Sequence, residues 1–279
     1  MPVIDFRLRP PLRGFLDMIM YANPERTARA TRMHGFEPAP SATQRSIDLL
    51  IAEMDAAGVT TGVVVGRVAG RFGSVSNEDV QAICEAYPGR FVGIASIDPA
   101  SRKKAVVAID DAAARGFRAI NIEPASYAEA MLADDRRLYP IYAHCEDRGL
   151  PVLIMAGGSA GPDLSYTVPV HLDRVAADFP DLKIVVTHGG WPWVHEMLHI
   201  AYRRPNVYLS PDQYLAGMPG MRDWIDAANG FLADRFLYGS SYPFTPVKEY
   251  AAWFRGLPFR PEVMDRLMYR NAAGLLGLA

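Results

Sequence analysis

Val3-Ile4-Asp5-Phe6-Arg7-Leu8-Arg9 is an apolar run that ends in two arginines spaced two residues apart. In a β-strand, residues i and i+2 point to the same side, so the two guanidinium groups are predicted to converge. If this strand opens a barrel, they lie at the mouth of the barrel. Two fixed positive charges at that place favour an anionic ligand and disfavour a metal ion.

The rest of the chain alternates short β-branched runs with amphipathic stretches. Strands are predicted at 3–8, 62–65, 91–97, 119–122, 152–155, 184–187, 207–209 and 236–238. Helices are predicted at 43–57, 77–87, 103–115, 136–148, 169–179, 194–203, 221–233 and 247–256, with a last helix at 261–276. Eight strand–helix units indicate a single (β/α)8 TIM-barrel domain over residues 1–279. An open doubly wound sheet is the alternative, but Arg9-Pro10-Pro11 follows the first strand where that fold would have a glycine-rich loop.

One segment interrupts this alternation. Residues 11–40 are too many for an ordinary loop between a strand and a helix, and they combine several arginines with methionine and aromatic residues. We predict that they form a lid insertion over the C-terminal mouth of the barrel. The alternative is an ordered excursion that packs on the outer helices.

Composition limits the partners and the compartment. The net charge of −2 gives no support for a nucleic-acid partner, and no apolar run approaches the ~18 residues of a membrane span. Cys84 and Cys145 lie far apart, which fits a reducing compartment better than a disulfide framework. The first residues do not read as a signal segment. We therefore expect a cytoplasmic protein without nucleic-acid or membrane partners; a homodimer is compatible with the sequence.

The ends of the predicted strands carry a resemblance to a known family. The ordered motifs are Tyr87-Pro88-Gly89-Arg90-Phe91, Phe179-Pro180-Asp181-Leu182-Lys183-Ile184, Thr187-His188-Gly189-Gly190 and Tyr238-Gly239-Ser240. With them the chain resembles the amidohydrolase-related (amidohydrolase 2-type) TIM barrels, a family that includes metal-dependent hydrolases, lactonases and aromatic-acid decarboxylases.

The resemblance implies a metal centre at the barrel mouth. Its ligands are a His-x-His pair on the first strand, one His at the end of the fifth and one of the sixth, and an Asp after Gly-Ser on the eighth. At these positions this chain has Arg7 and Arg9, Met155, His188 and Ser241. Arginine offers no lone pair, and a catalytic zinc ion needs about three protein ligands. We therefore predict a degenerate site with no metal and no other cofactor.

The same residues suggest a site for a small carboxylate. Arg7 and Arg9 are predicted to bind the carboxylate, and Arg9 to polarise a carbonyl group as well. The alternative is that both arginines form structural ion pairs with Glu123 or Asp212. His188 is predicted to transfer protons, and Glu123 is either an acid–base group or an arginine partner.

Further substrate contacts are predicted from the other strand ends. They are Met155, Trp191, Asp212, Ser241 and Tyr242. Phe6, Trp193 and Tyr214 either wall an aromatic pocket or pack between helices and barrel. The remaining histidines are interpreted as structural or surface residues: His34, His144, His171, His195 and His199.

Three functions fit this reading. The first is metal-independent hydrolysis of a small carboxylate-bearing lactone, ester or amide, with decarboxylation or another lyase step on an aromatic or unsaturated acid as the next choice. The second is a ligand-binding protein that has kept the cavity and lost catalysis. The third is a metal enzyme with a displaced site that uses His188 with Glu123 or Asp212.

Overall fold

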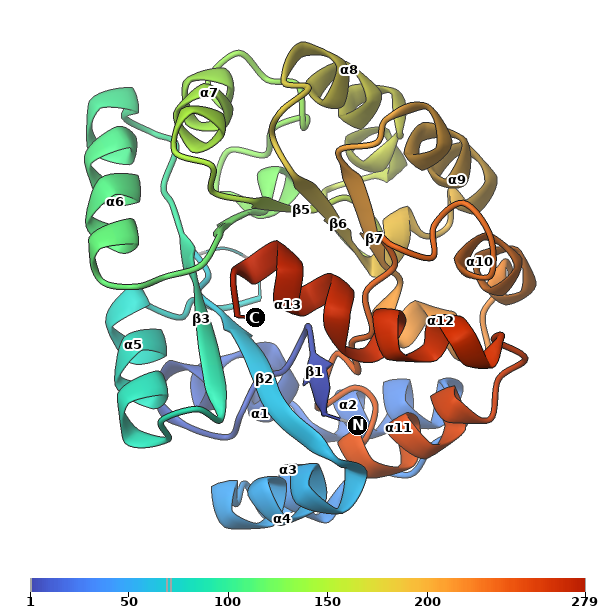
Figure 1. Cartoon of the computed structure of the whole chain (residues 1–279). Helices are drawn as coiled ribbons and strands as arrows, with labels where there is room; N and C mark the ends of the chain where they lie inside the picture. The colour runs from blue at the N-terminus through green and yellow to red at the C-terminus, as the bar shows by residue number, and fades with distance from the viewer. Residues whose placement is uncertain (1, 69, 71, 279) are drawn as a thin grey trace.

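A computed structural model describes residues 2–68, 70 and 72–278, and within this range seven parallel strands form one curled sheet (Figure 1). Each strand pairs with the next along the chain. The strands are β1 (Val3–Asp5), β2 (Val59–Val65), β3 (Phe91–Ser96), β4 (Ile120–Ile122), β5 (Val152–Met155), β6 (Ile184–Thr187) and β7 (Val207–Ser210). The predicted strand order and direction are thus confirmed.

The segment 236–242 closes the sheet between β7 and β1. The N–H of Leu237 donates to the carbonyl of Leu209 at 2.9 Å, and the N–H of Phe6 donates to the carbonyl of Tyr238 at 3.0 Å. A second parallel bridge joins Leu8 to Tyr242 further along. The (β/α)8 barrel is confirmed, whereas the predicted eighth strand is reduced to isolated bridges.

A buried carboxylate explains why the first and eighth strands are short. Oδ1 of Asp5 accepts the N–H of Arg7 at 3.1 Å and the N–H of Ser240 at 2.8 Å. The Asp5 side chain therefore accepts two backbone N–H groups that, in a regular β-sheet, would donate to the carbonyl groups of a neighbouring strand. The strand predicted at 3–8 ends at Asp5 for this reason, although Leu8 still bridges to its neighbour.

Helices surround the strands (Figure 1). They are α4 (Ile47–Ala57), α5 (Asn77–Ala86), α6 (Arg102–Ala114), α7 (Tyr139–Asp147), α8 (Val170–Asp178), α9 (Val194–Arg203), α10 (Met221–Ala228) and α11 (Val247–Arg255). The side chains of Ser46 and Ser76 cap the first turns of α4 and α5. The predicted helix 221–233 is shorter in the structure and ends at Ala228, and the side chain of Asn229 bonds to the backbone of Pro258 and Arg260.

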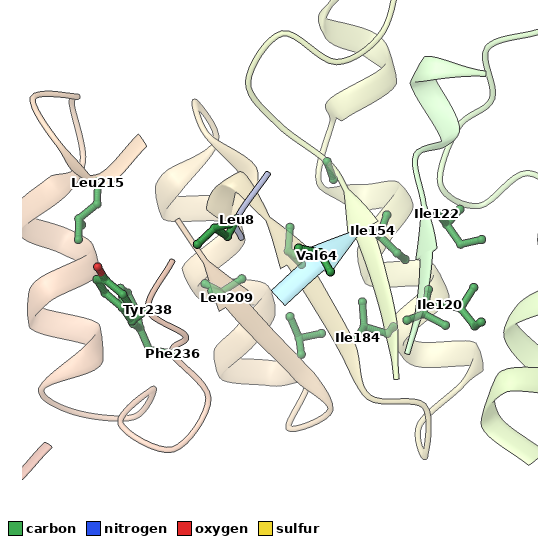
Figure 2. Close-up of a cluster of buried hydrophobic side chains, with 14 of the residues drawn as sticks. Leu8, Val64, Ile120, Ile122, Ile154, Ile184, Leu209, Leu215, Phe236 and Tyr238 are labelled. Atoms are coloured by element: carbon green, nitrogen blue, oxygen red, sulfur yellow. The ribbon is translucent and has the colours of Figure 1, made fainter. Parts of the chain in front are cut away.

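Strand residues alternate between two apolar layers, as the pleat requires. Val63 and Leu153 belong to a cluster inside the barrel, whereas Val64 and Ile154 belong to the larger cluster that contacts the helices. Figure 2 shows part of the larger cluster, with Leu8, Val64 and Leu209 among its labelled side chains.

The C-terminal segment covers the N-terminal ends of the strands. The predicted last helix consists of α12 (Pro261–Asp265), a π-helical turn (Arg266–Arg270) and α13 (Asn271–Leu276). Leu275 and Leu276 join the cluster inside the barrel, and Leu278 lines a groove with Phe91 at the start of β3. Figure 1 shows α13 lying across this end of the barrel.

The insertion after the first strand is helical. It contains a 3-10 turn (Arg13–Asp17), α1 (Ile19–Ala22) and α2 (Pro24–Met33), and it is followed by α3 (Pro40–Thr43). The Tyr21 hydroxyl donates to the Arg9 carbonyl at 2.7 Å and so holds α1 against the first strand. No helix in the described residues has the length and apolarity needed to cross a membrane. Cys84 and Cys145 are free thiols.

Candidate active site

A cavity of about 330 Å³ lies at the C-terminal ends of the strands. The barrel contributes Arg7, Arg9, Arg67, Met155 and His188 to its lining. The insertion supplies a wall of the same cavity, with Ile19, Met20, Arg26, Ala30, Met33 and His34. The residues predicted as a lid therefore face the cavity as well as packing on the barrel.

Three guanidinium groups meet at this cavity, and one carboxylate lies behind them. Oε2 of Glu123 is 2.5 Å from Nη2 of Arg67, and Oε1 is 3.9 Å from Nη2 of Arg7. Burial alone would raise the pKa of Glu123, but the cationic Arg67 and Arg7 outweigh burial and hold that pKa below its ordinary value. Glu123 is therefore ionised, and the arginines retain an excess of positive charge.

Two nitrogen atoms of the Arg7 guanidinium are not hydrogen-bonded within the described residues. Arg7 is 3% exposed, and these two atoms are its Nε and Nη1. Its Nη2 lies 4.0 Å from the Met155 sulfur, which is a weak acceptor. Unpaired buried guanidinium donors are costly, so this geometry favours an anion in the cavity. Of the two alternatives that the sequence left open at Arg7, the ion pair with Glu123 is present at 3.9 Å, and carboxylate binding stays a prediction.

Arg9 is held in place from the eighth segment. Its Nη1 donates to the carbonyl and to Oγ of Ser241, both at 3.0 Å, and its guanidinium lies 5.7 Å from the centre of the Phe244 ring. Burial and the neighbouring Arg7 lower the pKa of Arg9 to about 9. Arg9 therefore remains a cation at neutral pH.

His188 is oriented by a buried aspartate. Its Nδ1 lies 2.8 Å from Oδ2 and 3.0 Å from Oδ1 of Asp212, and its backbone N–H donates to Oδ2 at 3.3 Å. A carboxylate accepts, so Nδ1 carries the proton and Nε2 is left for another partner. Burial lowers the pKa of His188, and Arg7 and Arg9 lower it further, against the opposing charge of Asp212. The neutral imidazole is thus a base at neutral pH.

The local backbone at His188 is unusual. His188 and Asp212 both have left-handed backbone angles, with φ of 63° and 48°. Such angles in residues other than glycine cost on the order of 1 kcal/mol or more and persist where the surroundings fix them. Gly189 and Gly190 follow with φ of 57° and 73°, which a side chain would disfavour. The Thr187-His188-Gly189-Gly190 motif therefore encodes the turn that carries the imidazole.

Aromatic and apolar side chains form the walls. The Trp191 ring stacks on Tyr214 with centroids 5.1 Å apart and planes 14° apart. Phe72 lies under the Arg67 guanidinium at 4.9 Å. Phe244, Met155 and several insertion residues complete the apolar lining. A cavity that has arginines at its floor and flat apolar side chains as its walls suits a small planar organic anion.

The family model described as amidohydrolase, Amidohydro_2, matches residues 4–278. The chain belongs to this amidohydrolase family. It is also similar to a solved structure, an uncharacterized TIM-barrel protein, Bb4693, from Bordetella bronchiseptica. The two share 53% sequence identity over 99% of each chain, with a TM-score of 0.96.

More distant amidohydrolase-fold structures match over nearly the whole chain. A 2,6-dihydroxybenzoate decarboxylase from Rhizobium has 15% identity and a TM-score of 0.73, and covers 100% of this chain and 99% of its own. A 5-carboxyvanillate decarboxylase, LigW, from Sphingomonas paucimobilis has 17% identity and a TM-score of 0.68 over 99% of each chain. At this identity the likeness shows a shared fold. The search of curated proteins finds no match.

The donor set of this amidohydrolase-family protein does not fit the metal centre that the resemblance implies. The corresponding positions hold Arg7, Arg9, Met155, His188 and Ser241, of which only the imidazole is an ordinary zinc ligand. Among the described residues, no group of three His, Cys, Asp or Glu side chains could hold a metal ion. In the displaced-site alternative, the acidic ligand would be Glu123 or Asp212. Glu123 forms an ion pair with Arg67, and Asp212 is bonded to His188.

The structure divides the sequence-predicted site residues into two sets. Arg7, Arg9, Met155, His188 and Trp191 line the cavity. Glu123, Asp212, Ser241 and Tyr242 are not among the described residues that line it. The first three contact a lining arginine or His188, as described above. The Tyr242 hydroxyl instead lies 2.8 Å from Oγ of Ser41, outside the cavity. Phe6, which is fully buried, belongs to the cluster inside the barrel.

Sequence reasoning missed several lining residues. Arg67 follows the second strand, a position that could have indicated a role. The interpretation of His34 as a structural or surface residue is incomplete, because His34 is 7% exposed and lines the cavity. Nothing in the sequence of the insertion indicates which of its faces meets the barrel. Gln213 and Met218 were missed because their loop has no regular periodicity.

Proposed function

We propose that this protein hydrolyses a small lactone, ester or amide that bears a carboxylate, and that it does so without a metal ion. The observation that carries the proposal is that Arg7 and His188 line one cavity, where, among the described residues, two buried donors of Arg7 have no hydrogen-bond partner and Asp212 engages only Nδ1 of the His188 ring. Arg7 would bind the carboxylate of the substrate. Arg9 and Arg67 supply positive charge where the oxygen of the scissile carbonyl becomes negative.

The proposed reaction uses groups already in the cavity. His188 Nε2 takes a proton from water as the water oxygen bonds to the carbonyl carbon. The carbonyl electrons move onto its oxygen beside the guanidinium groups. When the carbonyl re-forms, the bond to the leaving oxygen or nitrogen breaks, and the proton on Nε2 passes to that atom. Asp212 holds the imidazole in the required tautomer throughout.

Charge favours this reaction over decarboxylation. Guanidinium groups around a carboxylate stabilise the ground state of an acid that must lose CO2, and a neutral imidazole is a poor proton donor to carbon. Decarboxylation or another lyase step on an unsaturated acid stays the second candidate, because the stacked Trp191 and Tyr214 form a flat wall suited to a planar ring.

Turnover of a panel of carboxylated lactones and aryl esters, followed by acid release, tests the proposal. Wild-type protein should hydrolyse at least one member after exhaustive chelation. Arg7→Met and His188→Asn should each lower kcat/KM by about 10²-fold or more, as for loss of an oxyanion donor or general base. Arg222→Met is the matched control, since the Arg222 side chain is 84% exposed and pairs only with surface Asp226 in the described residues.

Other outcomes decide between the alternatives. CO2 release from aromatic or unsaturated acids would establish the lyase function. Tight benzoate binding, measured by calorimetry and lost in Arg7→Met, without turnover of any compound, would identify a binding protein. Stoichiometric metal in the purified protein, with activity lost on chelation, would overturn the metal-independent mechanism.

A further inference from the structure

His34 brings a second imidazole to the cavity from the insertion. It caps the C-terminal end of α2 and is 7% exposed. Its Nδ1 lies 3.0 Å from the carbonyl oxygen of Ala216. A carbonyl only accepts, so Nδ1 carries a proton, and Nε2 is the ring nitrogen left to accept a hydrogen bond. Within the described part of the chain, this is the only hydrogen bond of the His34 side chain.

One short loop after β7 orients both cavity imidazoles. Asp212, at its start, fixes Nδ1 of His188, and Ala216, at its end, fixes Nδ1 of His34. Tyr214 lies between them, with its ring centroid 5.1 Å from that of His188 and 6.0 Å from that of His34. Both imidazoles meet the tyrosine nearly edge-on, at 77° and 89°. The loop therefore fixes Nδ1 of both imidazoles that line the cavity.

A third acceptor belongs to the same loop. Gln213 lines the cavity and is 8% exposed, and its Oε1 is buried without a hydrogen-bond partner among the described residues. A buried acceptor without a donor is unfavourable, so a group that donates to it would be bound selectively. Gln213 and His34 therefore both favour a ligand that donates a hydrogen bond.

Besides the hydroxyl groups of Ser159 and Tyr214, which can donate or accept, the cavity lining holds polar groups of two types. Arg7, Arg9 and Arg67 can only donate, whereas His34 Nε2 and Gln213 Oε1 are acceptors. His188 Nε2 is reserved for the proton of the attacking water in the proposed reaction. A ligand that satisfies both sides must carry an anionic acceptor at one place and a donor at another.

We propose that the carboxylate-bearing substrate of the proposed function also carries a hydroxyl group, so that Arg7 binds its carboxylate and the hydroxyl donates to His34 Nε2 or Gln213 Oε1. His34 is then a specificity-determining residue that contacts the substrate, and the insertion is part of the active site. The inference rests on the carboxylate site of the proposed function and adds the second recognition element. A site built to hydrogen-bond a hydroxyl discriminates against the analogue that lacks it.

Calorimetric titration with benzoate and its 2-, 3- and 4-hydroxy derivatives tests the inference without a known substrate. Wild-type protein should bind one hydroxybenzoate about tenfold or more tightly than benzoate. His34→Asn keeps an N–H for the Ala216 carbonyl and removes the Nε2 acceptor. It should reduce this preference about tenfold while the Kd of benzoate changes less than about threefold. His199→Asn on the exposed surface of α9 should leave every Kd unchanged.

Two further variants separate the possible failures. Gln213→Met removes the other acceptor and should also reduce the preference, which keeps the test informative if His34→Asn does not fold. If benzoate binds and Arg7→Met abolishes its binding, but the hydroxyl preference is absent or survives in both variants, the hydroxy-acid inference is overturned and the carboxylate site stands. If benzoate and all three hydroxybenzoates fail to bind wild-type protein, both proposals are overturned.

Discussion

Asp5 is a fully buried carboxyl group beneath the arginines. One oxygen accepts the N–H groups of Ser240 and Arg7, and the other has no hydrogen-bond partner among the described residues. Burial raises the pKa of Asp5 to about 6, from an ordinary value of 3.8. The folded chain therefore binds this proton more tightly than the unfolded chain does.

Asp5→Asn should change the pH dependence of stability. The raised pKa stabilises the fold below about pH 4, and this contribution is lost as pH rises through about 6. The loss amounts to about 3 kcal/mol for a shift of about two units. Asparagine keeps the Oδ1 acceptor and does not ionise. The free energy of unfolding of the variant relative to wild type should therefore rise by up to ~3 kcal/mol between pH 4 and 7, as measured in urea. A difference that does not vary with pH would refute this account.

His188 should titrate below the ordinary histidine pKa of 6.5, because burial and the adjacent arginines oppose its protonation. Asp212→Asn removes the carboxylate that raises the pKa, so the midpoint should fall further. NMR titration of the His188 ring measures both values without a substrate. With an active substrate, the variant should also lose about 10²-fold or more in kcat/KM, since the tautomer is no longer fixed. A wild-type midpoint at or above 6.5 would contradict the electrostatic picture.

At the scale of elements, the loop after β5 packs directly on the loop after β6. A Cβ placed on Gly157 would lie 2.9 Å from the Trp191 carbonyl oxygen and 3.0 Å from Gly190 Cα. The next residue, Gly158, donates its N–H to the same Trp191 carbonyl at 2.8 Å. Because these neighbours are backbone atoms, they cannot move aside as a flexible side chain would.

Gly157→Ala should therefore displace the Trp191 wall. We expect a loss of about 1–3 kcal/mol in the free energy of unfolding, as for overpacking, together with several-fold weaker benzoate binding. Gly274→Ala is the matched control, since a Cβ at this position in α13 meets no atom within 4 Å. The control should be neutral or more stable by up to about 1 kcal/mol. Equal effects of the two substitutions would show that the loop contact is unimportant.

Sequence patterns predict features that depend on neighbouring residues, and they miss features that depend on residues far along the chain. The spacing of Arg7 and Arg9 placed both at the cavity correctly, because the side-chain alternation of an extended strand is local. The patterns did not show that Asp5 interrupts the first strand, since that depends on Ser240, 235 residues away. The position of His34 in the cavity lining was missed for a similar reason. That position depends on a hydrogen bond to a loop 182 residues further along.

At the scale of the whole molecule, the apolar cluster that includes α13 and the candidate binding cavity lie at opposite ends of the barrel. The interior cluster continues into α13 through Leu275 and Leu276, which are 5% and 3% exposed. The cavity lies at the other ends of the strands. Because the barrel lies between the two regions, a substitution at one end should affect the other end only if the whole protein unfolds.

Leu276→Ala tests this separation. Deleting a buried leucine side chain should cost about 2–5 kcal/mol in the free energy of unfolding. The thermal midpoint should fall by several degrees, whereas the benzoate Kd, measured well below that midpoint, should stay within about twofold of wild type. A large change in affinity in a folded variant would mean that the C-terminal segment and the cavity are coupled.

The stacked Trp191 gives the cavity an optical property. Among the described residues it is the only tryptophan that lines the cavity; Trp224 is fully buried elsewhere. A ring that enters beside Trp191 and Tyr214 changes the surroundings of one indole, and so should change its fluorescence. Ligand entry could then be followed in stopped-flow experiments on the millisecond scale before any product is known, with Trp191→Phe as the silent reference.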